Sequence, residues 1–151
     1  MRMFGASTGE WRVPAQPTLD DFMLGNQTLV CSMFRRSLWA VAGGYRDTGL
    51  GRDLVAEDWD LWFRMAARGA RFSNVHREML LNYRIREVGQ AMSTHPDRPS
   101  WAEQGLSIQR RNVALLTEEA RALSRRQAAR VLRPKHGEVA MRLAMRRATE
   151  A

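Results

Sequence analysis

Apolar and polar positions in the first part of the chain predict one short helix, a buried strand and a second short helix. Residues 18–26 have a helical pattern that Thr18 can cap, with two aspartates in the first turn. The continuous apolar run "QTLVCSMF", residues 27–34, predicts a buried strand. Residues 35–45 predict a helix that ends at two consecutive glycines, because glycine tolerates the left-handed conformation at a helix end.

The rest of the chain alternates in the same way, after an entry segment with little periodicity at residues 1–17. The pattern predicts a loop at 46–55, a helix at 56–69, strands at 70–75 and 78–86, and a loop at 87–100. From Trp101 it is helical almost to the end, with an interruption near Pro134. Alternating strands and helices predict an α/β fold, but two or three strands make a thin sheet for such a fold.

Three regions follow from this organisation: an entry segment at 1–24, a central α/β region at 25–100 and a basic helical extension at 101–151. The 151 residues fit one domain of ordinary size, and 44% hydrophobic with 26% charged residues is typical of a soluble globular protein. Apolar runs are too short to span a membrane, and the start lacks the apolar core of a signal peptide. Cys31 is the single cysteine, which we interpret as a small buried residue of the 27–34 strand. A reducing, cytoplasmic setting is therefore expected.

Positive charge is concentrated in the extension. Residues 101–151 carry eleven arginines and lysines against five glutamates, whereas residues 1–100 carry only two net positive charges. The simplest interpretation is a solvated helix that packs on the domain. A basic amphipathic helix can also lie on an anionic membrane surface, at the inner face of the membrane, or bind nucleic acid. Nucleic acid is the less favoured partner, because no aromatic residue that could stack on bases follows Trp101.

The helix at 56–69 opens with three carboxylates, Glu57, Asp58 and Asp60. Winding at ~100° per residue places Asp60 on a polar stripe with Arg64, and predicts a solvent-exposed ion pair worth ~0.2–0.5 kcal/mol. Glu57 lies on the same stripe, in the first turn, where a carboxylate meets the positive end of the helix dipole. Asp58 falls outside the stripe. The opposite, apolar face carries Trp59, Trp62, Phe63 and Ala66.

Asp58 therefore has two interpretations. It can cap the helix, or it can point into a cleft between the helix and the preceding loop, where it could take a proton from a bound hydroxyl. A shared cation on Asp58 and Asp60 is disfavoured, because side chains two positions apart on a helix point away from each other. A zinc site is disfavoured too, since the histidines at 76, 95 and 136 lie far apart and no cysteine pair accompanies them.

Four motifs in order, "FRRS", "GGYRD", "EDWDLWFRMAARG" and "LLNYR", resemble the C-terminal half of the catalytic domain of family 2 glycosyltransferases, which have the GT-A fold. The resemblance covers residues 24–93 and implies a partial GT-A, Rossmann-like domain. It also implies inverting transfer of a sugar from a nucleotide-sugar donor to an acceptor hydroxyl, with Asp58 as the general base. The residues that the resemblance assigns to acceptor or substrate binding are Glu57, Gly43, Gly44, Tyr45 and Arg84. For Arg84, a surface ion pair is an equally good interpretation.

The chain departs from the family pattern in several places. The N-terminal half of the family, with its nucleotide-binding strands and metal-binding Asp-x-Asp, has no counterpart before Leu24. A divalent metal, Mg²⁺ or Mn²⁺, is expected for the complete enzyme, but we identify no metal site in this chain. Arg86 occupies a place where relatives often have histidine, and the Gln-x-x-Arg-Trp signature of processive synthases is missing.

We therefore expect a chain that carries the acceptor-binding residues and the general base of such an enzyme but lacks its donor-binding half. The chain is a fragment, its start is wrongly assigned, or a separate donor-binding partner completes it. Exposed apolar edges left by the missing half could drive self-association. The first alternative is a non-catalytic half-domain that binds a glycan or a partner. The second, less favoured, is a basic nucleic-acid-binding module.

Overall fold

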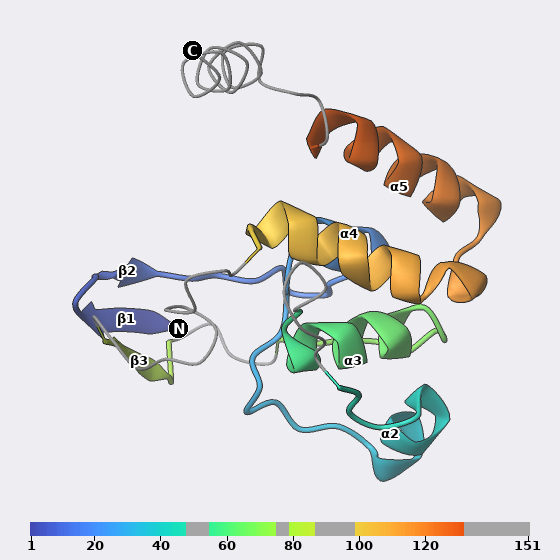
Figure 1. Cartoon of the computed structure of the whole chain (residues 1–151). Helices are drawn as coiled ribbons and strands as arrows, with labels where there is room; N and C mark the ends of the chain where they lie inside the picture. Colours follow the sequence, from blue (N-terminus) through green and yellow to red (C-terminus); the bar gives the residue numbers. More distant parts are fainter. Residues whose placement is uncertain (48–54, 75–78, 87–98, 132–151) are drawn as a thin grey trace, which may run out of the picture.

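The computed structural model describes residues 1–47, 55–74, 79–86 and 99–131. In this part of the chain a small three-stranded mixed sheet accompanies five α-helices, so the predicted α/β class is confirmed. The sheet lies at one side of the molecule and the helices at the other (Figure 1).

The sheet has the strand order β2-β1-β3, with β1 at Arg2–Gly5, β2 at Gly9–Glu10 and β3 at Asn82–Ile85. Strand β1 pairs antiparallel with β2 and parallel with β3. Residues 1–17, where the sequence shows little periodicity, therefore supply two of the strands. Four residues are too few to show a period, and the partner of β1 lies far away in the sequence.

The five helices are α1 (Leu19–Leu24), α2 (Arg36–Ala42), α3 (Glu57–Ala66), α4 (Trp101–Arg111) and α5 (Glu118–Val131). All lie where the pattern predicts helix. Helices α1 and α4 begin at capping boxes, in which Thr18 and Ser100 each bond the residue three positions on. A 3-10 turn at Val113–Leu115 separates α4 from α5. The predicted interruption near Pro134 lies outside the described residues.

Two predicted strands are absent from the described residues. Residues 27–34 contain a turn instead, closed by a bond from the Ser32 amide to the Leu29 carbonyl at 3.1 Å, and Cys31 is exposed, not buried. Residues 70–74 contain no strand either. Of the strands predicted after the central helix, only the one at 78–86 is confirmed, over Asn82–Ile85. Apolar composition predicted the strand at 27–34, but within the described residues no neighbouring strand pairs with that run.

Helix α3 is the centre of the core and packs against α1 and α2, while α4 packs against α1 and α5. Trp59, Trp62 and Phe63 are buried in it. The Trp59 indole donates to the Phe22 carbonyl at 2.8 Å. Helix α4 approaches this ring at Gly105, where an added Cβ would lie only 3.1 Å from the ring. The tryptophans of α3 therefore hold the helices together, as their position on the apolar face predicts.

Candidate functional site

Asp58, in the first turn of α3, is partly buried and has a different partner for each carboxylate oxygen. Oδ1 accepts a hydrogen bond from the Trp59 backbone amide at 2.7 Å, and Oδ2 accepts one from the Asn26 side chain at 3.2 Å. The first bond satisfies one of the amides that a helix start leaves without a partner. The second points the other oxygen toward the segment that follows α1.

Burial raises the pKa of the Asp58 carboxyl above its ordinary value, and the negative charge of Glu57 adds to this rise. The hydrogen bonds from Trp59 and Asn26 act in the opposite direction and do not cancel it. A raised pKa brings a carboxylate closer to the range in which a general base is effective near neutral pH.

The turn after α2 brings a phenol to this carboxylate. Gly43 and Gly44 have φ angles of 80° and 67°, in the left-handed region that favours glycine. The next residue, Tyr45, is 47% exposed. Burial raises the pKa of its phenol, and the charges of Asp58 and Glu57 raise that pKa further. The two glycines and Tyr45, which the family resemblance assigns to acceptor binding, therefore lie in one turn, and the Tyr45 phenol is within electrostatic range of the carboxylates at the head of α3.

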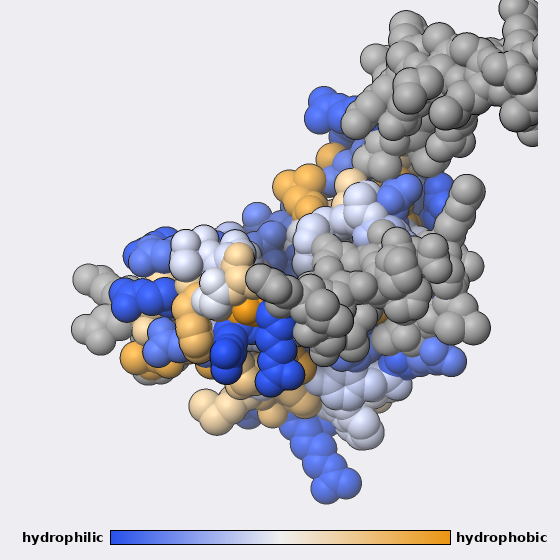
Figure 2. Space-filling view, turned by 60° about the vertical axis from the view of Figure 1, so that its left-hand side comes forward, coloured by the Kyte–Doolittle hydropathy of each residue, from blue (hydrophilic) through white to orange (hydrophobic). Residues whose placement is uncertain are grey.

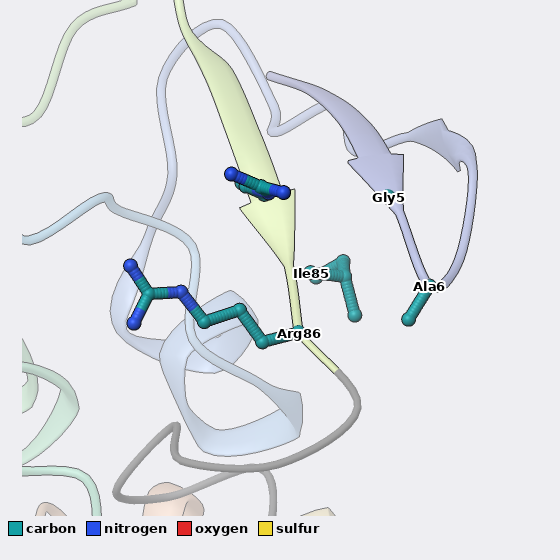
Figure 3. Close-up of a pocket in the computed structure, with 5 residues that line it drawn as sticks. Gly5, Ala6, Ile85 and Arg86 are labelled. Atoms are coloured by element: carbon teal, nitrogen blue, oxygen red, sulfur yellow. The ribbon is translucent and has the colours of Figure 1, made fainter.

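Arg84 is not part of this group. It lies on β3 and lines a shallow hollow of about 410 Å³ with Gly5, Ala6, Ile85 and Arg86, none of which belongs to α3 or to the turn after α2. Figure 3 shows the Arg86 side chain extending from the end of β3, with Gly5 and Ala6 at the end of β1. The structure thus assigns the predicted substrate-binding residues to two different places.

The sequence prediction for Asp60 and Arg64 is correct about the pair and wrong about its surroundings. Arg64 Nε donates to Asp60 Oδ2 at 2.9 Å, but the two side chains are 0% and 2% exposed. Arg64 also donates to the Ala42 carbonyl and, at 2.7 Å, to the Gly44 carbonyl. At Asp60 and Arg64 the supposed solvated stripe is therefore covered by the end of α2 and by the turn that follows it, whereas Glu57 is only partly buried.

A second set of bonds completes this buried network. Asn112, at the end of α4, donates to Asp60 Oδ1 at 2.9 Å and accepts from Arg46 at 3.0 Å. The network ties α3 to α4 and to both sides of the Tyr45 turn. Sequence reasoning missed Asn26 and Asn112, because nothing in the local pattern marks either residue. Of the bonds in this network, the sequence predicted only the Asp60–Arg64 ion pair, from the spacing of four residues between them.

The described residues do not fit the divalent metal expected for a complete enzyme. Asp58 and Asp60 bond different partners, so they do not form a shared ligand pair. The described residues contain no group of three or more His, Cys, Asp or Glu side chains that could hold a metal ion. The three histidines considered for zinc lie outside those residues.

Fold and site together define an α/β protein with a partly buried carboxylate at the head of its central helix. Comparisons of the chain with protein-family models, with curated proteins and with solved structures found no match. No helix in the described part of the chain is both long and apolar enough to cross a membrane.

Replacing Asn26 with alanine is expected to raise the pKa of Asp58 further, because the Asn26 hydrogen bond favours the ionised carboxylate. The measurement is a pH titration of the Asp58 carboxyl carbon by NMR in the wild type and the variant. A lower or unchanged pKa for Asp58 would contradict the geometry.

Gly44→Ala is expected to destabilise the protein more than Gly69→Ala. Both glycines have a positive φ, so alanine costs about 1–2 kcal/mol at either position. At Gly44 the added Cβ would also lie 2.9 Å from the Trp39 ring, whereas nothing lies within 4 Å at Gly69. We expect an additional loss of about 1 kcal/mol or more for Gly44→Ala in urea unfolding. Equal losses would show that Trp39 does not confine the turn.

Proposed function

We propose that this chain supplies the acceptor side of an inverting, nucleotide-sugar-dependent glycosyltransferase of the GT-A type, with Asp58 as the general base. The observation that carries the proposal is that the Asp58 carboxylate, the Asn26 amide and the Tyr45 phenol lie near one another at the head of α3. A partly buried carboxylate with a raised pKa accepts a hydrogen bond from Asn26, and its charge raises the pKa of the Tyr45 phenol. The four motifs that resemble family 2 glycosyltransferases contribute the reaction class.

In the proposed reaction the acceptor hydroxyl lies against Asp58 Oδ2. As the hydroxyl oxygen attacks the anomeric carbon, its proton passes to the Asp58 carboxylate. The bond from the anomeric carbon to the phosphate oxygen breaks, and the nucleoside diphosphate leaves with the electron pair. Attack opposite the leaving group inverts the anomeric configuration.

The other residues of the site have supporting roles in this proposal. The Asn26 amide orients the carboxylate, and burial, with a smaller contribution from the negative charge of Glu57, keeps Asp58 basic. The two glycines before Tyr45 let a sugar approach the backbone of the turn. The donor and its divalent metal are held by residues outside the described set or by a partner chain. A cytoplasmic location belongs to the same proposal.

The test is a transfer assay with the full chain, alone and together with a candidate donor-binding partner. Labelled nucleotide sugars are offered with a panel of saccharide acceptors, and the products are analysed by NMR. We expect a glycoside whose anomeric configuration is opposite to that of the donor. A product with retained configuration would overturn the mechanism, and acceptor binding without any transfer would identify a non-catalytic glycan-binding module.

A further inference from the structure

The segment that joins the two sides of the candidate site exposes an unusual number of large apolar side chains. It runs from residue 26 to residue 46 and includes α2. Met33 is 100% exposed and Val30 is 60% exposed. We name the exposed large apolar residues of this segment the apolar rim: Val30, Met33, Phe34, Trp39 and Val41.

The apolar rim is exposed although neighbouring residues of the same segment pack against the core. Leu38 and Ala42 turn toward the core, and Phe34 keeps one edge on the Trp62 ring at a centroid distance of 5.3 Å. The segment is therefore anchored to α3 while its outer side chains face away. Clusters of exposed apolar residues are rare on soluble monomers and mark interaction sites.

The charges of this segment all have one sign. Residues 26–46 contain Arg35, Arg36 and Arg46 and no aspartate or glutamate. All three arginines are exposed, although the Arg46 guanidinium also donates to Asn112. Exposed tryptophan, phenylalanine and methionine beside arginines, without a carboxylate between them, form the pattern of a surface that lies in the interface of an anionic membrane. Aromatic residues, methionine and arginine are also enriched at protein interfaces, so a protein partner is the competing occupant that the experiment has to separate from lipid.

The position of the segment suits a flat partner. Helix α2 and the stretch leading into it form the lower edge of the molecule in Figure 1. Figure 2, in which the sheet side comes forward, shows hydrophobic and strongly hydrophilic side chains next to one another on that face. Asn26, at the start of the segment, bonds Asp58, and Tyr45, near its end, is close enough for the charge of Asp58 to raise its pKa.

We propose that the apolar rim, together with Arg35, Arg36 and Arg46, docks this chain on an anionic lipid surface. Docking through this segment holds the head of α3 beside the membrane, because the segment begins and ends at that site. The arginines of α5, which lie in the basic extension, are not required for it.

The experiment is co-sedimentation of the full chain with vesicles of phosphatidylcholine alone and of equal parts phosphatidylcholine and phosphatidylglycerol. We expect binding to the anionic vesicles that weakens as salt is raised. The double variant Arg35→Gln, Arg36→Gln should bind roughly 20-fold more weakly. Val30→Ser with Met33→Ser should also weaken binding, and this loss should persist at high salt. The matched control, Arg125→Gln with Arg126→Gln on the exposed side of α5, should bind like the wild type.

Three results would overturn the proposal: no binding to anionic vesicles, loss of binding in the α5 control alone, and full binding by both segment variants. Sedimentation velocity of the same proteins tests the alternative that the apolar rim binds another protein molecule, such as a second copy of this chain. If Val30→Ser with Met33→Ser abolishes self-association and leaves vesicle binding unchanged, the rim is a protein interface. All of these measurements report binding alone, so their failure leaves the glycosyltransferase proposal standing, and failure of transfer leaves the docking result standing.

Discussion

Arg64→Ala is expected to lower the free energy of unfolding by about 3–5 kcal/mol, because it removes one partner of a buried ion pair and leaves the other uncompensated. The guanidinium is completely buried and bonds Asp60 and the carbonyls of Ala42 and Gly44. Without it, the Asp60 carboxylate keeps only the Asn112 amide, and the two carbonyls lose a charged donor. Urea unfolding followed by tryptophan fluorescence measures the loss.

The chain offers a matched control for this prediction. Arg121 pairs with Glu118 at 2.8 Å across one helical turn of α5, but these side chains are 36% and 74% exposed. Arg121→Ala is expected to cost less than about 1 kcal/mol, as exposed pairs generally do. Arg64→Lys should fall between the two, because an ammonium cannot reproduce the fork that bonds a carboxylate and two carbonyls together. Similar losses for Arg64→Ala and Arg121→Ala would mean that the buried network does not stabilise the fold.

Asp58→Asn is expected to reduce sugar transfer by about 10²-fold or more, the usual loss when a general base is removed. The amide has nearly the shape of the carboxylate and can still accept from the Trp59 amide, so the helix start should persist. It cannot take the acceptor proton. The measurement is kcat for transfer in the complete system, with the acceptor Kd determined separately. Full transfer by Asp58→Asn would rule out this carboxylate as the base.

The stability of the same variant separates lost chemistry from lost folding. Because the pKa of Asp58 is raised in the folded state, the folded protein binds this proton more tightly than the unfolded chain does. The contribution of Asp58 to stability is therefore complete below the unfolded pKa and is lost as pH rises through the folded pKa. Asp58→Asn should then be at least as stable as the wild type near neutral pH and lose any such advantage in acid. A strongly destabilised variant at neutral pH would mean that its lost activity reports unfolding.

Part of the site could be predicted from the sequence because it depends on positions within one helix. Winding the helix placed Asp58 off the polar stripe, and the structure shows it partly buried with a partner outside its own helix. The same reasoning failed for Asp60 and Arg64. It treats every polar stripe as solvated, whereas here a turn from α2 and the end of α4 cover the stripe and use its charges.

The sequence by itself determined the helices, because caps, turn glycines and the helical period act within a few residues. Thr18 and Ser100 begin helices, and Gly43 ends one, with local bonds alone. Only the tertiary structure decided the strands and the exposure of the apolar run at 27–34. A strand needs a neighbouring strand to bond. Strand β1 pairs in parallel with β3, which comes much later in the sequence, whereas in the described part of the chain the more apolar run at 27–34 pairs with no strand. Burial and strand pairing depend on which distant segments meet, and the pattern of one segment does not contain that information.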